Sequence, residues 1–200
     1  DTYRLINEVS EVNPHCEWAF VTNGHYRFGA FVIAHLNKIK LRWLQVSLDS
    51  LIPETYARIR VRGDLRRTLE TISAIKEYQK ERACDGRPFR FNVSMCVQLL
   101  NRNEIESFLE FALERNLVPS LQFAFGPPSA SLLSLSRKDK LRLIKDLERI
   151  DQQFDVRTIH PVMQPVSYLF PIIEPLRVSL SQQGVNTARR RVPSADKVPT

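Results

Sequence analysis

The stretch Trp43-Leu44-Gln45-Val46-Ser47-Leu48-Asp49-Ser50 decides the fold of this 200-residue chain. It is a short, largely apolar run closed by polar residues, which is typical of a buried strand that ends in a loop. Side chains alternate along a strand, so Ser47 and Asp49 point to one face at its end. A carboxylate placed there needs hydrogen-bond partners or a ligand. Two interpretations stay open for Asp49: contact with a ligand, or capping of the following loop through backbone amides.

Similar strand patterns recur along the chain, and a helical pattern separates each from the next. Strands are expected at 18–21, 43–48, 89–100 and 121–125, and helices at 3–9, 28–39, 64–84, 103–116 and 136–150. Strand–helix–strand units require crossovers, and crossovers give parallel strands. The predicted fold class is therefore α/β, either as an open sheet or as part of a barrel.

Three helix starts carry capping signals. Asp64 is the expected N-cap of the longest helix. Asn103, with Glu106 three residues on, has the spacing of a capping box, and Ser136 with Asp139 is expected to cap the last clear helix.

The chain beyond residue 155 has a different composition. Four prolines between positions 161 and 175 favour extended or irregular chain over residues 156–181. Polar, basic and small residues dominate 182–200 and predict a disordered basic tail. The sequence thus divides into an α/β part at 1–155, this extension and the tail.

Composition excludes several classes of protein. The net charge is +7, and residues 189–200 contribute +3 of it. The remaining +4 is weak evidence for binding of nucleic acid, which usually requires a concentrated basic face. No apolar run approaches the roughly 20 residues that span a bilayer. The three cysteines are widely spaced and form no Cys-x-x-Cys pair, which indicates reduced thiols and a cytoplasmic location.

Candidate binding residues follow from the strand order. In parallel α/β folds, ligands bind at the carboxyl ends of the strands. Asn23 follows the first strand, Ser47 and Asp49 close the second, and Asn92 and Gln122 lie on the third and fourth.

Three motifs carry a resemblance to a known family. They are Val21-Thr22-Asn23-Gly24, then Val46-Ser47-Leu48-Asp49-Ser50, then Tyr56-Ala57-Arg58-Ile59-Arg60 ahead of the long helix. Their order and spacing resemble the radical SAM superfamily over residues 1–150. Asn92 and Asn103 also match positions often seen after the fifth strand of that family.

The resemblance implies a partial (β/α)6 barrel that lacks its first two βα units and binds S-adenosylmethionine across its strand ends. It places Ser47 and Asp49 near the ribose or the methionine moiety, and Arg60 at the methionine carboxylate. It also implies cofactor contacts from Asn23, Asn92 and Gln122, the last within a segment that flanks the adenine. For Arg60 the alternative is a surface ion pair with Glu54 or Asp64.

The chain departs from the family in its cysteines. The family holds a [4Fe–4S] cluster with the thiolates of a Cys-x-x-x-Cys-x-x-Cys motif, and Cys16, Cys84 and Cys96 do not have that spacing. We expect the cluster ligands to lie upstream of Asp1. On this hypothesis the chain is the C-terminal part of a radical SAM enzyme and is inactive alone. In the whole enzyme, a 5′-deoxyadenosyl radical would act on a small molecule or a peptide.

Two rival hypotheses remain. One is a non-enzymatic, cluster-free α/β domain that binds a partner protein or a small ligand. The other is an unrelated α/β barrel enzyme. If two strands are missing, the strand at 18–21 is an open sheet edge, which predicts self-association.

Overall fold

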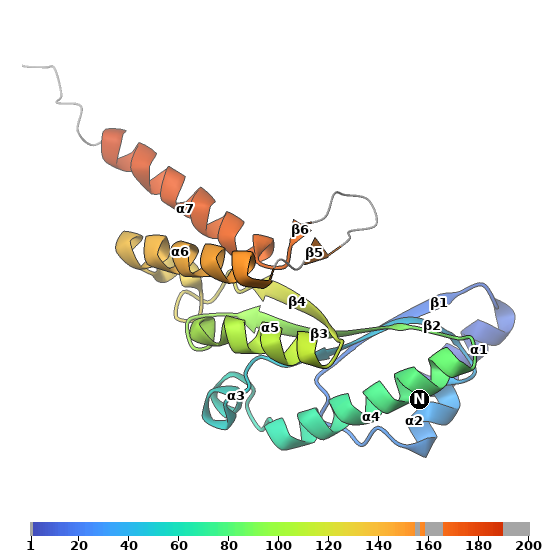
Figure 1. The fold of residues 1–200 in the computed structure, drawn as a ribbon. Coiled ribbons are helices and arrows are strands. Elements are labelled where there is room, and N and C mark those ends of the chain that lie inside the picture. Colours follow the sequence, from blue (N-terminus) through green and yellow to red (C-terminus); the bar gives the residue numbers. More distant parts are fainter. Residues whose placement is uncertain (1, 155–156, 159–165, 190–200) are drawn as a thin grey trace, which may run out of the picture. The chain divides into compact units, whose positions relative to one another are not determined.

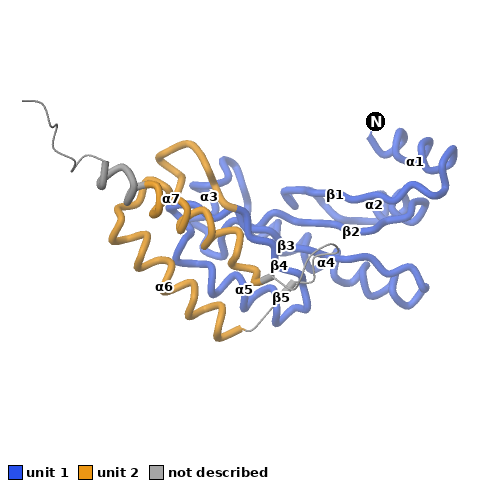
Figure 2. Tube along the Cα trace, turned by 90° about the horizontal axis from the view of Figure 1, so that it is seen from above, with its two compact units in different colours: residues 1–122 blue, residues 123–200 orange. Residues whose placement is uncertain are grey.

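A computed structural model describes residues 2–154, 157–158 and 166–189. The chain forms two compact units, residues 1–122 and 123–200 (Figure 2). The division falls inside the segment that the sequence assigns to the α/β part.

A four-stranded sheet forms the centre of the first unit (Figure 1). Its strands, in spatial as in chain order, are β1 (Glu17–Thr22), β2 (Lys40–Ser47), β3 (Arg90–Val97) and β4 (Val118–Phe123). Both β1 and β3 run parallel to β2, with Val21 opposite Gln45 and Gln45 opposite Asn92. The α/β class with a parallel sheet is confirmed, and the sheet has the form of a partial β/α barrel.

Helix α1 (Thr2–Val12) precedes the first strand, and the other helices of this unit connect successive strands. The connecting helical elements are α2 (Ala30–Leu36), α3 (Pro53–Ile59), α4 (Leu65–Cys84), the 3₁₀ turn η1 (Arg102–Glu104) and α5 (Ile105–Glu114). Asp64 caps α4 as expected, because its Oδ1 accepts a hydrogen bond from the Arg67 amide at 3.2 Å. The capping prediction for Asn103 is wrong. Asn103 lies inside η1, and α5 has no side-chain cap.

The two faces of the sheet differ in polarity. Phe20 and Leu44 line one cavity together with side chains of α1 and α2, so this face is covered by helices. The same face of the sheet also carries Val46, Phe91 and Val93, which are at most 1% exposed. Because side chains alternate, the opposite face carries Gln45, Ser47, Asn92 and Ser94. The interior face of this partial barrel is therefore polar.

The second unit is built on helices. It contains η2 (Leu132–Ser134), α6 (Arg137–Phe154), the short antiparallel strands β5 (Arg157–Thr158) and β6 (Val166–Ser167), and α7 (Phe170–Arg189). Ser136 and Asp139 cap α6 as predicted, with 3.2 Å between the Asp139 amide and Ser136 Oγ. Helix α7 packs against α6 and η2.

The expectation of extended chain is wrong from Phe170 onward, because α7 is helical there and continues into the predicted tail as far as Arg189. Leu169, Ile172, Ile173 and Leu176 are all buried and repeat at helical spacing. Pro171 lies in the first helical turn, where its missing amide hydrogen costs little. The rest of the predicted tail lies outside the described residues. Among those described, no helix is both long and apolar enough to cross a bilayer.

Candidate functional site

A hydrogen-bonded cluster centred on Asp49 occupies the carboxyl edge of β2 and β3. The Asp49 carboxylate is only 5% exposed, and its Oδ2 lies 2.7 Å from Arg60 Nε. Its Oδ1 accepts a hydrogen bond from the Cys96 amide on the neighbouring strand at 2.8 Å. Arg60 directly follows α3. One carboxylate therefore ties together the end of β2, the end of α3 and β3.

Asn101 supports the Asp49 cluster through hydrogen bonds to the backbone. Its Nδ2 donates to the backbone oxygens of Asp49 at 2.7 Å and of Cys96 at 3.0 Å. Its Oδ1 accepts from the Gln98 amide at 2.8 Å. Asn101 is fully buried. The side chain thus fixes the backbone at the ends of two parallel strands.

Glu104 holds the loop that follows Asp49. Its Oε2 accepts hydrogen bonds from Ser50 Oγ at 2.5 Å and from the Leu51 amide at 3.1 Å. Glu104 is 6% exposed and Ser50 is fully buried. Buried polar groups satisfied in this way rigidify the site that they surround.

The loop after β1 borders the same edge. Gly24 adopts φ +73°, and a Cβ there would lie 3.0 Å from Val46 Cγ1, so the turn requires glycine. The exposed Asn23 side chain accepts a hydrogen bond from the His25 amide at 3.0 Å. The loop therefore brings His25 toward α3.

His25, which is half-buried, begins a chain of hydrogen bonds that leads inward to Tyr56 and Thr68. Its Nε2 lies 2.9 Å from the Tyr56 hydroxyl, which lies 2.9 Å from Thr68 Oγ1 on α4. Partial burial, and then the nearby Arg60 guanidinium, lower the pKa of His25 below its ordinary value of 6.5. Burial also raises the pKa of the Tyr56 hydroxyl. Both side chains are therefore held in their neutral forms near pH 7.

Asn92 carries an unsatisfied polar atom on the interior face. Its Oδ1 is buried and has no hydrogen-bond partner among the described residues. The neighbouring Gln45 and Ser94 are 7% and 4% exposed. A buried amide oxygen without a donor is costly, so the position suits a ligand that supplies an N–H or O–H group.

The structure brings some predicted site residues together and separates others. Asp49 and Arg60 form an ion pair with each other, in place of the alternative pairing of Arg60 with Glu54 or Asp64. Ser47 lies opposite Ser94 in the sheet, on the same face as Asn92. The side chains of Asn23 and Gln122 are exposed to solvent.

Sequence reasoning missed several residues of this edge: Asn101, Glu104, His25 and Thr68. Asn101 and Glu104 follow the third strand and belong to the same class of polar strand-end residues that identified Asp49. From the sequence, the polar residue with a structural role after this strand was expected to be Asn103, two residues after Asn101.

The cysteines do not form a cluster site. Cys16 precedes β1, Cys84 ends α4 and is exposed, and Cys96 lies on β3. No group of three or more His, Cys, Asp or Glu side chains suited to a metal ion exists among the described residues. The described part of the chain therefore does not fit a [4Fe–4S] cluster, whereas the interior face fits a polar organic ligand.

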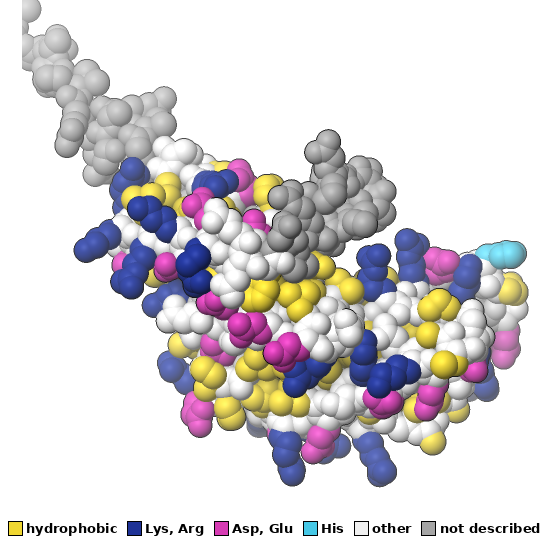
Figure 3. Space-filling view, in the orientation of Figure 1, with side chains coloured by type: hydrophobic (Ala, Val, Ile, Leu, Met, Phe, Trp, Pro, Cys, Tyr) yellow, Lys and Arg dark blue, Asp and Glu magenta, His cyan; other side chains and the backbone are white. Residues whose placement is uncertain are grey.

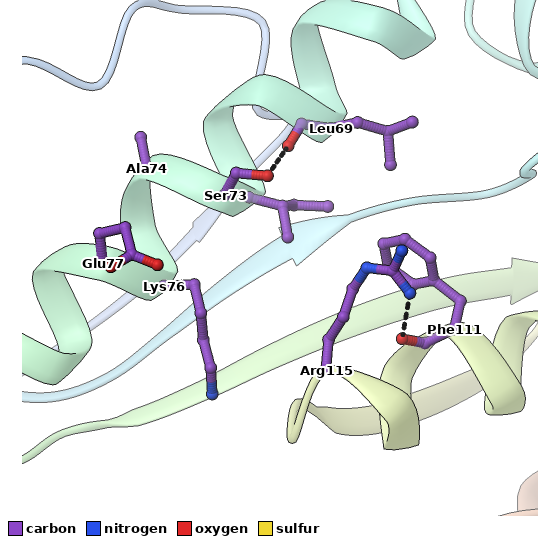
Figure 4. A pocket seen from close by; sticks show the side chains of 8 residues that line it. Leu69, Ser73, Ala74, Lys76, Glu77, Phe111 and Arg115 are labelled. Carbon is purple, nitrogen blue, oxygen red and sulfur yellow. Dashed lines mark hydrogen bonds between the residues drawn. The ribbon is translucent and has the colours of Figure 1, made fainter.

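A groove between α4 and α5 lies elsewhere on the first unit. Figure 4 shows Lys76 and Glu77 of α4 on one side, and Phe111 of α5 with Arg115, the residue after α5, on the other. It measures about 430 Å³, and the Arg115 guanidinium lies 4.2 Å from the centre of the Phe111 ring. None of its lining residues belongs to the strand-end cluster.

Comparison with known proteins relates the chain to one kind of enzyme. No protein-family model matches it. It is 28% identical to a GTP 3',8-cyclase of Syntrophomonas wolfei over 155 residues, which cover 78% of this chain and 44% of the relative. A GTP 3',8-cyclase of Petrotoga mobilis is 28% identical over 113 residues, covering 56% of this chain and 32% of the relative. The chain spans less than half the length of these relatives. The similarity supports a relationship with the radical SAM superfamily, which the motifs also resemble.

Proposed function

We propose that this chain supplies the S-adenosylmethionine-binding face of a radical SAM enzyme whose cluster ligands lie outside the described residues. The observation that carries the proposal is the buried, unpartnered Oδ1 of Asn92 on the polar interior face. The order of the three motifs and the similarity to the two GTP 3',8-cyclases support it.

The residues of this face have separate roles in the proposal. Asn92 accepts a hydrogen bond from an amino or hydroxyl group of the cofactor, and Ser47 contacts it from the neighbouring strand. Arg60 offers the cofactor carboxylate its remaining guanidinium donors while Nε stays on Asp49. Asp49 is therefore a positioning residue that orients Arg60. Asn23 and Gln122 contact the cofactor from the loop after β1 and from β4.

S-adenosylmethionine supplies radical chemistry in this superfamily when a reduced cluster is present. The chain's own residues bind the cofactor, orient its carboxylate and hold it against the sheet. Because the relatives are named GTP 3',8-cyclase, GTP is the first substrate to test. The proposal includes that the 200-residue chain alone cleaves no S-adenosylmethionine.

Binding of S-adenosylmethionine to the full chain, measured by titration calorimetry, tests the proposal. Asn92→Ala removes the acceptor, and we expect the affinity to fall about five- to tenfold. The exposed Asn103→Ala is the matched control, with unchanged affinity. The free energy of unfolding of Asn92→Ala should stay within about 1 kcal/mol of the parent, because the lost oxygen has no partner in the described chain.

Equal affinities for Asn92→Ala and Asn103→Ala, or no binding by the parent chain, would overturn the assignment of this face. A separate assay supplies the chain with iron, sulfide, reductant and S-adenosylmethionine. Formation of 5′-deoxyadenosine there would contradict the inactivity of the chain alone. Binding of S-adenosylmethionine without its cleavage is the expected combination.

A further inference from the structure

A basic hollow lies at the amino ends of β1, β2 and β3, at the edge of the sheet opposite Asp49. It measures about 550 Å³. Its lining includes five cationic side chains, Lys38, Lys40, Arg42, Arg82 and Arg87, and a single acidic one, Glu17. Figure 3 shows lysine and arginine side chains gathered over β1 and β2. An eight-residue strand separates this edge from the Asp49 cluster, a distance of roughly 25 Å.

Arg82 places a buried positive charge in the wall of the hollow. The residue is 3% exposed. Its Nε donates to the backbone oxygen of Arg87 at 3.1 Å and its Nη1 to that of Leu36 at 3.2 Å. No carboxylate pairs with Arg82 in the described part of the chain. The guanidinium also lies 5.9 Å from the centre of the Tyr78 ring. A buried guanidinium whose partners are all neutral retains its charge, and a nearby anion stabilises it.

The exposed cations that line the hollow have few acidic partners. Glu17 accepts both Lys40 and Arg42, each at 3.0 Å, although their side chains are 59% and 66% exposed. Arg87 pairs with Asp85 at 3.2 Å, and both are about half exposed. Exposed ion pairs of this kind contribute little to stability. An incoming anion can therefore replace Glu17 at small cost.

The lining indicates the class of ligand. A hollow of this volume lies in the range of small-molecule sites. None of the described residues that line it is aromatic, so they offer a nucleic-acid base no stacking partner. Arginine and lysine together are the common partners of phosphate groups, through forked and single-point contacts respectively.

We propose that this hollow binds a small anion with several phosphate groups, at a site separate from the interior face. The strands hold a ligand bound there at the edge of the sheet opposite Asp49. This inference does not depend on the function proposed above, since none of its residues contributes to S-adenosylmethionine binding.

Titration of the full chain with inorganic tripolyphosphate tests the proposal. Arg42→Gln should weaken binding about tenfold. Arg66→Gln, which removes an exposed, ion-paired cation from α4, should leave binding unchanged. Glu17→Gln should strengthen binding several-fold because it releases Lys40 and Arg42. Glu77→Gln makes the same charge change beside Lys80 and should have no effect.

Equal weakening by Arg42→Gln and Arg66→Gln would show that only net charge matters, and would overturn the site. Absence of tripolyphosphate binding by the parent chain would do so as well. Tighter binding of an oligoglutamate peptide than of tripolyphosphate would replace the small anion with an acidic protein segment. Unchanged S-adenosylmethionine affinity in Arg42→Gln would confirm that the two sites are separate.

Discussion

Asp49 combines two roles that a surface carboxylate does not have. It pairs with Arg60, and it accepts the amide of Cys96 from the adjacent strand. Removal of one member of a buried ion pair leaves the other charge without a partner, which is strongly destabilising. The residue therefore contributes both to the stability of the sheet edge and to the direction of the Arg60 side chain.

We expect Asp49→Ala to lower the free energy of unfolding by about 3 kcal/mol in urea titrations. Arg60→Gln should also cost about 3 kcal/mol, because it leaves the Asp49 carboxylate, only 5% exposed, without a counter-charge. Glu70→Ala, which breaks the exposed pair with Arg66, should change stability by no more than about 0.5 kcal/mol. Similar losses for Asp49→Ala and Glu70→Ala would contradict the buried role of Asp49.

His25 makes stability depend on pH. Its pKa in the folded chain is lowered, chiefly by burial, so the folded state favours the neutral ring. The contribution to stability is complete above about pH 6.5 and is lost as the pH falls through the folded-state pKa. The stability difference between the parent chain and His25→Gln should therefore shrink between about pH 8 and about pH 5. Unfolding titrations at both values measure it, and a constant difference would refute the expectation.

At the scale of elements, the segment between β3 and α5 contains two asparagines. Asn101 bonds to the backbone of the strand ends, whereas Asn103 is the residue that the sequence predicted as a cap. Asn101→Ala removes three buried hydrogen bonds to backbone groups. We expect a loss of about 2–3 kcal/mol, whereas the exposed Asn103→Ala should change stability by no more than about 0.5 kcal/mol. Thermal or chemical unfolding of the two variants decides the matter. A larger loss for Asn103→Ala would restore the capping-box interpretation.

The strands of the sheet could be predicted because their signals are local. An apolar run such as Trp43–Leu48 ended by polar residues is sufficient to identify a buried strand. Helix α7 could not be found in the same way, because Pro171 and Pro175 suggested a break. The burial of Ile172, Ile173 and Leu176 against neighbouring elements outweighs the cost of a proline inside the helix.

The candidate site was predictable only in part. Alternation predicted Ser47 and Asp49 on one face, but β2 ends at Ser47 and Asp49 lies in the loop that follows it. The partner of Arg60 was not predictable, because Asp49 is neither adjacent in the chain nor at helical spacing. Asn101 and Glu104 reach back to residues about 50 positions earlier, and only the fold brings them there.

At the scale of the whole molecule, β1 is one edge of the sheet in the described part of the chain. Its Val21 side chain is 61% exposed. An exposed edge strand with apolar side chains is a template for pairing with another copy. We therefore expect the average mass of the isolated chain to rise with concentration in analytical ultracentrifugation.

A charge on the edge strand should suppress this association. Val21→Lys places a lysine on β1 and should shift the chain toward monomer. Val61→Lys, at a position 84% exposed outside the sheet, is the matched control and should associate as the parent does. A parent chain that remains monomeric at all concentrations would contradict the expectation.

At the carboxyl edge, polar side chains accept hydrogen bonds from backbone amides that strand pairing would otherwise satisfy. The amides of Leu51, Cys96 and Gln98 donate to Glu104, Asp49 and Asn101 respectively. Their exchange with deuterium from solvent therefore follows the opening of this cluster and not the separation of the strands. The exchange rates of these three backbone amides therefore report the rate of motion at the carboxyl edge of the sheet.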